Sequence, residues 1–399
     1  MQQANLSSWL IWLAAGIFYL FEFIHRVIIS VMIPELMGSF DVSLARLGSL
    51  SACYFYAYAL AQIPVGWLID RYGSRYLLTA ACLTISAGSL VFANANHMLL
   101  ADMCRVLIGF SSAFAFVGCL KLGATWFPNH KFGFIVGLTN LLGVTGAIIG
   151  GKPAAYAVDA YGWRQTMLLS AIIGAVLAFI LWVIIKDKAP AKNIHKTNSK
   201  ILSVIKCKQT WLVAVFGGLM VAPITTYSEL WGVSFLVNNY ELSRPAAAQI
   251  ATLTFIGIAI GGPTIGWLSD YLRLRKIPMF IGAIGAFCSI GAILFAPLLP
   301  LWLLYLLHLT FGFFTSSMLL CYSLISEATP TSIRATTIAL TNSIVMLFGA
   351  LLQTISGILL DYSHLDYNLS FAPLIGCYLL ALICFYFIHE TNCCYTNKE

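Results

Sequence analysis

The chain has 399 residues, of which 60% are hydrophobic and only 9% carry a charged side chain. Soluble domains contain roughly 25% charged residues, so this composition excludes an ordinary soluble protein and indicates one that lies in a lipid bilayer. The formal net charge is +7. Because the basic residues cluster in short segments between apolar runs, contact with lipid headgroups explains this charge and no nucleic-acid partner is needed.

Twelve apolar runs follow one another along the chain, each long enough to cross the hydrocarbon core as a helix. The first is about 25 residues long, too long for the core of a cleaved signal peptide. None shows the alternation of barrel strands, so we predict an all-α integral membrane protein. The predicted spans are residues 8–35, 44–69, 76–94, 97–126, 131–156, 163–186, 209–237, 245–270, 277–297, 300–326, 333–360 and 369–389.

An internal repeat divides these spans into two sets of six. The segment 66–75, GWLIDRYGSR, recurs in weakened form as GWLSDYLRLR at 266–275. Each copy closes an apolar run and opens a short basic loop, which indicates two related six-helix bundles. We expect an N-terminal bundle at residues 1–186, a cytoplasmic linker at 187–208, and a C-terminal bundle with a short cytoplasmic tail at 209–399.

Both copies resemble the loop between helices 2 and 3 in the major facilitator superfamily, G-x-L-x-D-R-x-G-R-R. In the first copy, Ser74 stands where a basic residue is usual. The second copy has Tyr271 in place of the arginine and Arg273 in place of the glycine, and it keeps Gly266, Leu268, Asp270 and Arg275.

Further segments extend this resemblance over nearly the whole chain. Arg105 and Gly109 resemble the R-x-x-x-G element of helix 4, and segments 126–133 and 327–334 resemble the loops between helices 4 and 5 and helices 10 and 11. The resemblance implies a twelve-helix transporter of two six-helix bundles. Segments 18–27 and 54–66 resemble a bacterial branch that includes phagosomal nutrient transporters and siderophore permeases.

The distribution of basic residues predicts the orientation. Most of the 22 Lys and Arg residues fall in loops on one side, and only Arg46, Arg164 and Arg244 lie in loops on the other. The positive-inside rule then places both termini and the linker in the cytoplasm. We predict a multi-pass protein of the bacterial inner (plasma) membrane. The 11 cysteines lie in spans or face the reducing cytoplasm, so they indicate neither a disulfide framework nor a metal site.

The repeated loop supplies the candidate gating residues. An acid at the end of a span can pair with nearby basic side chains, and such pairs would have to break before the cytoplasmic side opens. The alternative is that Arg71 and Arg75 only anchor the topology. The predicted gating residues are Asp70, Arg71, Gly73, Arg75, Asp270 and Arg273.

Charged residues inside the spans are the strongest candidates for a transport site, because burying a charge in a membrane is costly unless it is paired or wetted. Glu22, His25 and Arg26 lie within one turn and share one face of the first span. They would handle substrate or protons, or else form a structural ion pair. Glu229, beside Tyr227 in the seventh span, is the other deeply placed acid. It lines a cavity or serves as a structural hydrogen-bonding group.

Three further basic positions lie in spans. The resemblance links Arg105 to proton coupling or bundle contacts. Lys121 either faces the cavity or extends its side chain to the cytoplasmic surface. His308 is interpreted as a core histidine whose hydrogen bonds are satisfied.

Polar residues outline the rest of the predicted cavity. Tyr54, Tyr58 and Gln62 form a stripe along the second span, which is also compatible with simple packing. Their sequence positions predict that four more polar side chains are buried hydrogen-bonding groups: Asn140, Tyr322, Asn342 and Gln353. Because fixed cations outnumber acids in the N-terminal half, the cargo is expected to carry a carboxylate or another anionic group.

These features predict a secondary active transporter of a small polar organic solute, working by alternating access and coupled to protons through Glu22 or Glu229. No phosphate-binding loop is present, so the transporter is expected to run on a gradient and not on nucleotide hydrolysis. A sodium-coupled carrier and facilitated diffusion remain alternatives. A transporter-like sensor would need a longer partner-binding segment, and an enzyme would need a nucleophile–base pair or a metal set. We expect a monomer without cofactors.

Overall fold

A computed structural model of the chain describes residues 6–128, 132–187, 207–329 and 334–393, the side chains of Ile63, Asp70 and Ala335 excepted. Within these ranges every regular element is a helix. Eleven of the predicted spans contain a helix long and apolar enough to cross a membrane. The remaining one, residues 44–69, forms the 29-residue helix α3 (Leu44–Tyr72). The predicted spans are therefore confirmed to within a few residues. Most of the predicted linker lies outside the described residues.

The described helices form two compact units. Unit 1 contains the described parts of Met1–Val42 and Cys53–Asn193, and unit 2 contains those of Ser43–Ala52 and Ile194–Glu399. The first turns of α3 therefore group with unit 2, whereas the sequence placed them in the N-terminal bundle. The other elements of unit 1 are α1 (Leu6–Val27), η1 (Ile28–Val31), α2 (Ile33–Phe40), α4 (Ser74–Ala93), α5 (Met98–Trp126), α6 (Phe132–Gly150), α7 (Lys152–Tyr161) and α8 (Trp163–Ile184).

In unit 2 the seventh span is interrupted by a turn of π-helix, η3.

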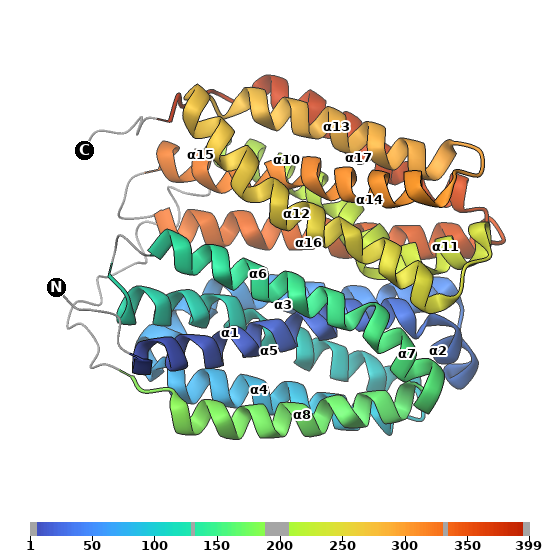
Figure 1. Cartoon of the computed structure of the whole chain (residues 1–399), viewed down its shortest axis with the longest axis horizontal. Coiled ribbons are helices and arrows are strands. Elements are labelled where there is room, and N and C mark those ends of the chain that lie inside the picture. Colours follow the sequence, from blue (N-terminus) through green and yellow to red (C-terminus); the bar gives the residue numbers. More distant parts are fainter. Residues whose placement is uncertain (1–5, 129–131, 188–206, 330–333, 394–399) are drawn as a thin grey trace. The chain divides into compact units, whose positions relative to one another are not determined.

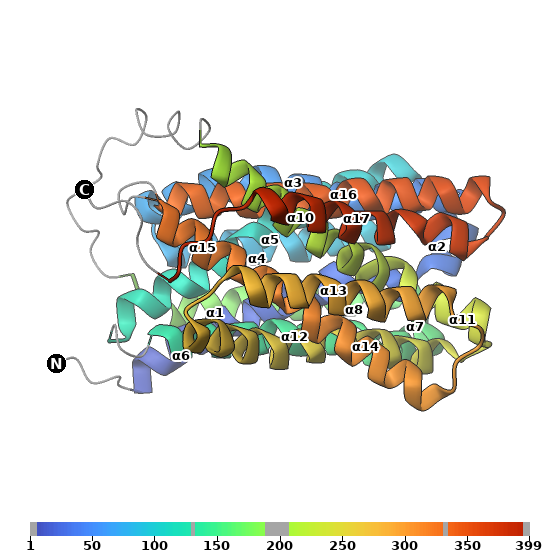
Figure 2. The ribbon, with the colours of Figure 1, turned by 90° about the horizontal axis from the view of Figure 1, so that it is seen from above.

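Figures 1 and 2 show that the long helices of each unit run alongside one another. The elements of unit 2 are α10 (Lys208–Thr226), η3 (Tyr227–Trp231), α11 (Gly232–Tyr240), α12 (Arg244–Leu272), α13 (Lys276–Phe295), α14 (Leu301–Thr315), η4 (Ser316–Leu319), α15 (Leu320–Ala328), α16 (Arg334–Tyr362) and α17 (Tyr367–Phe387).

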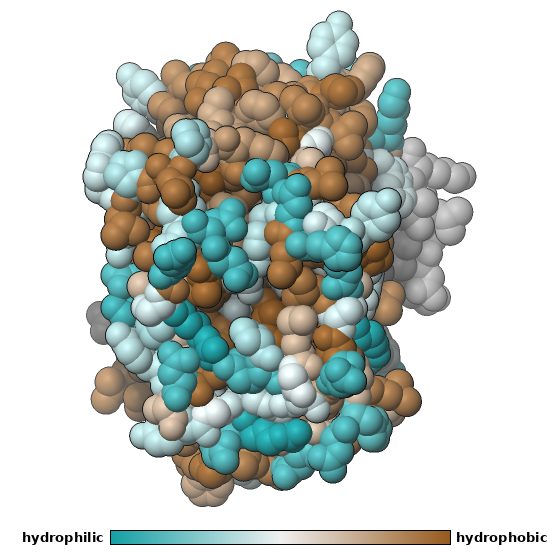
Figure 3. Space-filling model, turned by 90° about the vertical axis from the view of Figure 1, so that its right-hand side faces the viewer, coloured by the Kyte–Doolittle hydropathy of each residue, from teal (hydrophilic) through white to brown (hydrophobic). Residues whose placement is uncertain are grey.

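The surfaces of the helices suit a lipid environment. On α8, Ile172, Val176, Phe179 and Val183 are 62%, 55%, 69% and 55% exposed. A water-soluble protein rarely presents such a continuous apolar face, so this face is suited to lipid. Figure 3 views the ends of the helices, where hydrophilic residues gather and hydrophobic residues cover the flanks. The chain is a multi-pass membrane protein.

Carboxylate side chains cap the N-termini of three helices. Asp361 of α16 accepts the backbone N–H groups of Leu44 and Ala45 at 2.9 and 2.8 Å, and so caps α3. Asp187, just after α8, caps α4, and Glu390, just after α17, caps α13. The first N–H groups of a helix have no partner within the helix, so each carboxylate satisfies donors at its positive end. The caps on α4 and α13 occupy equivalent places in the two halves.

One glycine in each half lies at a close contact between two helices. A Cβ on Gly109 of α5 would overlap the backbone oxygen of Tyr54 in α3. A Cβ on Gly312 of α14 would overlap the backbone oxygen of Thr254 in α12. In each half, therefore, the fourth span crosses the second at a glycine, because only glycine lets the backbones approach so closely.

We predict that Gly109→Ala destabilises the protein by about 1–3 kcal/mol, the usual cost of overpacking, because the added methyl group must push α5 away from α3. The measurement is the Tm of the purified protein. Gly137→Ala in α6 is the matched control, since nothing lies within 4 Å of the added atom. Equal Tm values for the two variants would contradict the close contact.

Candidate functional site

A cluster of buried polar side chains lies where α1, α3 and α5 of unit 1 meet. Glu22, Arg26, Tyr54, Tyr58 and Arg105 are all less than 9% exposed. The Tyr54 hydroxyl donates a hydrogen bond to Glu22 Oε1. The structure therefore brings together five of the residues that the sequence predicted for the transport site.

Arg105 of α5 lies against the hydrogen-bonded pair of Tyr54 and Glu22. Its guanidinium lies 4.7 Å from the centroid of the Tyr54 ring, a cation–π contact, and its Nη1 donates to the carbonyl oxygen of His25 at 2.9 Å. Its Nε and Nη2 atoms are buried and have no hydrogen-bond partner among the described residues. A buried guanidinium with two unused donors is a strong potential binding group for a carboxylate.

His25 faces a different set of helices from Glu22. Its Nδ1 lies 3.0 Å from the carbonyl oxygen of Phe21, which can only accept, so Nδ1 carries the proton. Its Nε2 lies 2.8 and 3.1 Å from the hydroxyls of Ser89 in α4 and Ser170 in α8. Both nitrogens are therefore occupied: Nδ1 bonds within α1, and Nε2 joins α1 to α4 and α8. This geometry favours a structural contribution by His25.

The remaining predicted residues of unit 1 lie on the surface of the helices. Lys121 and Asn140 are exposed, so the prediction that Asn140 is buried is wrong. The reason is the helix period: the adjacent Thr139 takes the buried side of α6, where it accepts a hydrogen bond from Trp12. Lys121 lies on the exposed side of α5.

In unit 2, the residues predicted for the site are divided between two places. Tyr227 and Glu229 are buried in the π-turn, at 0% and 2% exposure. Tyr322 and Asn342 are half-buried and hydrogen-bonded to each other at 2.8 Å, which links α15 to α16. Gln353 is fully buried, as predicted, and donates to the carbonyl oxygen of Thr225 at 2.7 Å. Turns of π-helix occur frequently at functional sites.

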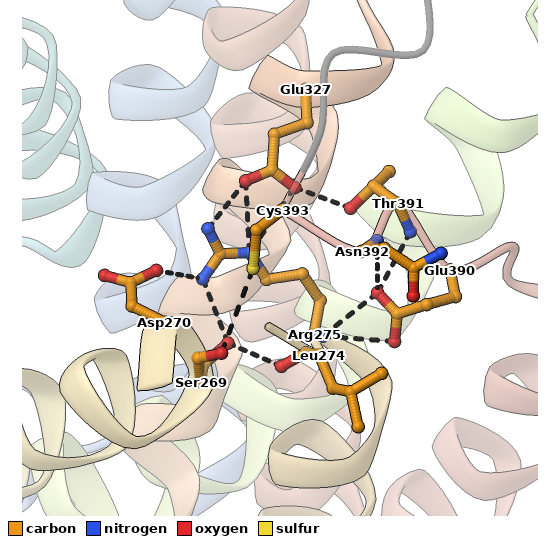
Figure 4. A network of polar contacts seen from close by, with 9 residues as sticks. All are labelled: Ser269, Asp270, Leu274, Arg275, Glu327, Glu390, Thr391, Asn392 and Cys393. Atoms are coloured by element: carbon orange, nitrogen blue, oxygen red, sulfur yellow. Dashed lines mark hydrogen bonds and ion pairs between the residues drawn. The ribbon is translucent and has the colours of Figure 1, made fainter. Parts of the chain in front are cut away.

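A second polar cluster joins the loop between α12 and α13 to the end of α15 (Figure 4). Arg275 Nη2 and Nε donate to Glu327 Oε1 at 2.6 and 3.1 Å, and Nη1 donates to Asp270 at 2.6 Å. Burial alone would lower the pKa of Arg275, but its bonds to Glu327 and Asp270 raise that pKa above the ordinary value. Arg275 therefore stays charged.

The segment after α17 completes this second cluster. Thr391 donates to Glu327 Oε2 at 2.5 Å, and Glu390 accepts the backbone N–H groups of Arg275 and Lys276. Burial raises the pKa of Glu390, but the backbone N–H donors outweigh it and hold that pKa below the ordinary value. Its contribution to stability is therefore present at neutral pH and is lost only as the pH falls through this lowered pKa.

The structure places the predicted gating residues unequally. Asp270 is in the cluster, but Arg273 is exposed, and its backbone takes the left-handed conformation with φ +53°. Its counterpart Gly73 also has a positive φ, +86°. Arg273 thus occupies the turn position of the repeat, and Arg275 makes the ion pairs. The identical spacing of Asp70 to Arg75 and of Asp270 to Arg275 could have identified Arg275 from the sequence.

In the equivalent loop of unit 1, the basic residues contact aromatic rings. Arg71 is exposed and lies 5.1 Å from the ring centroid of Trp67. Arg75 lies 4.2 Å from the ring centroid of Trp182 and donates to its carbonyl oxygen at 2.7 Å. The side chain of Asp70 lies outside the described residues.

Two bundles of membrane-spanning helices with buried charged clusters define a membrane transporter, and comparison with known proteins identifies its family. The family model of the Major Facilitator Superfamily matches residues 11–352 and 230–392. The chain therefore belongs to this superfamily: it is a transporter of twelve transmembrane helices and not an enzyme.

Individual proteins agree with this assignment. The chain is 26% identical over 314 residues to an uncharacterized transporter, YybO, of Bacillus subtilis, covering 71% of each chain. It is 22% identical over 413 residues to the probable galactarate/D-glucarate transporter GarP of Escherichia coli, covering 92% of this chain and 91% of that one. A hexuronate transporter of Bacillus subtilis is 26% identical over 264 residues, 63% of this chain and 62% of that one.

Solved structures support the fold. A D-xylose–proton symporter matches with a TM-score of 0.77 at 17% identity, covering 96% of this chain and 99% of that one. A bacterial homologue of the human lysosomal transporter Spinster, in an inward-facing and unoccupied conformation, matches with a TM-score of 0.74 at 17% identity, over 97% and 95% of the chains. The narrower resemblance to phagosomal and siderophore transporters stays a prediction.

We predict that Arg275→Lys lowers stability by about 1–2 kcal/mol, because an ammonium group cannot keep the planar double contact with Glu327. The Tm of the purified protein measures this loss. Arg273→Lys, two residues away and exposed, is the matched control and should leave the Tm unchanged. If both variants melt at the same temperature, Arg275 does not hold this cluster together.

Proposed function

We propose that the protein is a secondary active transporter of a small, polar organic solute that carries a carboxylate, and that it works by alternating access with proton coupling. It acts as a monomer in the bacterial inner membrane, with both termini in the cytoplasm, as the distribution of Lys and Arg indicates.

The observation that carries this proposal is the state of Arg105. Its guanidinium is 2% exposed and lies deep in unit 1, with Nε and Nη2 unpartnered among the described residues. Burying a cation in this way is costly, and a carboxylate that binds both donors would offset the cost. Tyr54, whose ring lies against Arg105, fixes the adjacent acid Glu22 through its hydroxyl. We assign Arg105, Tyr54 and Tyr58 to cargo binding and His25 to orientation of α1.

The relatives support this class of cargo. The named solutes of two of them are hexuronate and galactarate or D-glucarate, and each of these is a sugar acid. A cation in the buried cluster of this chain suits such solutes, because they present a planar carboxylate and several hydroxyl groups.

Coupling to protons is assigned to Glu22 and Glu229, the two fully buried acids of the transport sites. A carboxyl group in a desolvated site can bind and release a proton near neutral pH. Sodium coupling and facilitated diffusion are the alternatives, and a solute sensor is a third. The cluster of Arg275, Glu327 and Asp270, together with the loop around Asp70 and Arg75, is proposed as the cytoplasmic gate.

A thermal-shift screen with hexuronates, galactarate and the corresponding neutral hexoses tests the cargo class. We expect an acid to raise the Tm of the wild-type protein, and its neutral hexose to have no effect, because only the acid satisfies Arg105. Arg105→Gln should abolish the shift, whereas Lys121→Gln, which removes an exposed cation, should preserve it. Equal shifts by acid and neutral sugar would contradict the proposal.

The assignment of the coupling acids predicts that Glu22→Gln or Glu229→Gln abolishes pH-driven accumulation of the solute but retains its exchange. Glutamine resembles protonated glutamate in shape but cannot ionise, and exchange needs no net proton movement. The measurement is uptake and counterflow of a labelled hexuronate in proteoliposomes.

Glu241→Gln, at an exposed glutamate just after α11, is the matched control for these variants and should accumulate solute normally. If both buried variants still accumulate solute in response to an imposed pH gradient, protons are carried elsewhere and a sodium-coupled carrier becomes the better interpretation. If the wild-type protein binds solute but never exchanges it, the sensor is favoured.

A further inference from the structure

His308 occupies in unit 2 the place that Arg105 occupies in unit 1. Arg105 lies four residues before Gly109, and His308 lies four residues before Gly312. Each glycine makes the close contact between the fourth and second spans of its half, on Tyr54 and Thr254 respectively. Because this crossing fixes the register of the two helices, the side chains one turn earlier are directed to equivalent positions.

Both residues reach the first span of their own half. Arg105 donates to the carbonyl oxygen of His25 in α1, and His308 contacts the hydroxyl of Tyr227, which follows α10 directly. His308 Nδ1 lies 2.7 Å from the carbonyl oxygen of Leu304, so Nδ1 must donate there. Nε2 of the neutral ring is then an acceptor, and the Tyr227 hydroxyl donates to it at 3.1 Å. His308 and Tyr227 are both 0% exposed.

Tyr227 is the first residue of the π-turn that contains Glu229. A π-turn accommodates an extra residue in the helix, so conversion to an α-helix would rotate the residues that follow by about 100° relative to those before. The direction of the Glu229 side chain therefore depends on whether the turn keeps its π form.

Side chains from three other helices hold the turn. Gln353 of α16 donates to the carbonyl oxygen of Thr225, His308 of α14 accepts from Tyr227, and Ser228 donates to Thr254 of α12 at 3.1 Å. The ring of Tyr227 also packs against Phe235, Phe311 and Phe371, with centroids 5.7, 6.4 and 6.1 Å away. The three hydrogen bonds are made between Thr225 and Ser228, across the point where the helix departs from α geometry.

We infer that Tyr227 and His308 form a positioning pair, which keeps the seventh span in its π form and so fixes where the carboxyl group of Glu229 lies. In this inference the pair binds neither the cargo nor the transported proton, and it affects transport only by positioning Glu229. This inference rests on the proposed function in one respect, the participation of Glu229 in transport. It assigns to His308 a purpose beyond filling the core, at the position where unit 1 has its buried cation.

The position of residue 229 can be followed without knowledge of the cargo. In a background without the native cysteines, Glu229→Cys is labelled with N-ethylmaleimide in membrane vesicles, alone and combined with Tyr227→Phe or His308→Phe. Removing the hydrogen bond releases the turn, and we expect labelling to accelerate about five-fold, the factor that one lost buried hydrogen bond corresponds to.

Two controls separate positioning from general loosening. Tyr378→Phe deletes a second fully buried hydroxyl of unit 2, which contacts Thr315 at 3.1 Å, and should leave the labelling rate of Cys at 229 unchanged. Val213→Cys, earlier in α10, should label equally in all backgrounds. His308→Gln keeps an acceptor for Tyr227 and should restore the slow rate.

Transport supplies the second readout. With a labelled hexuronate or galactarate, Tyr227→Phe and His308→Phe should lose the accumulation that Glu229→Gln loses, and His308→Gln should recover it. If Tyr227→Phe labels no faster than Tyr378→Phe, the positioning pair is wrong. If labelling accelerates as expected but Glu229→Gln accumulates solute normally, the pair is supported and the proposed role of Glu229 fails.

Discussion

The contact between helix backbones at Gly109, and again at Gly312, is the constraint on which the two buried polar clusters proposed as transport sites depend. Water cannot satisfy polar groups in the hydrocarbon core, so a buried Arg or His must find its partners on neighbouring helices. The glycine crossing brings those helices close enough. It places Arg105 over Tyr54 in one half, and His308 within reach of Tyr227 in the other. A larger residue at either glycine would separate these groups, which lie one helical turn earlier.

Much of this arrangement could be predicted from the sequence, and the part that could not has a physical reason. Span positions follow from hydropathy, and the repeated loop indicates two bundles. Glu22, Arg26 and Arg105 are recognisable because a charge in a span must have a partner, and Tyr54 because it belongs to a polar stripe along its helix. Asn140 was misplaced because its face depends on how α6 packs, and adjacent residues of a helix differ by about 100°. The π-turn at Tyr227 depends on contacts with three other helices, and no local pattern predicts it.

Arg273 and Arg275 lie in the same copy of the repeated loop but differ in their contacts. Arg273 stands where the family's loop usually has a glycine, and it is among the gating residues predicted from the sequence. Matching positions gives the opposite result, since Gly73 and Arg273 both take a positive φ at the turn. The two turn residues share the sign of φ but not ψ, which is 154° at Gly73 and 36° at Arg273, and their side chains differ as well. Arg275, at the position of Arg75, is the residue that pairs with Glu327 and Asp270.

The two candidate transport sites share one framework, the crossing of the fourth and second spans at a glycine, and they differ in charge. In unit 1 the fourth span carries a cation near the acid of the first span, so attraction between Arg105 and a carboxylate can compete with Glu22 for the site. In unit 2 the equivalent position carries a neutral histidine, which cannot attract an anion in that form but can accept a hydrogen bond and hold a turn in place. An anionic solute is therefore expected to bind mainly to unit 1. The fourth span of unit 2 supplies no such cation near Glu229, so in the proposed mechanism Glu229 binds and releases its proton without direct competition at Arg105.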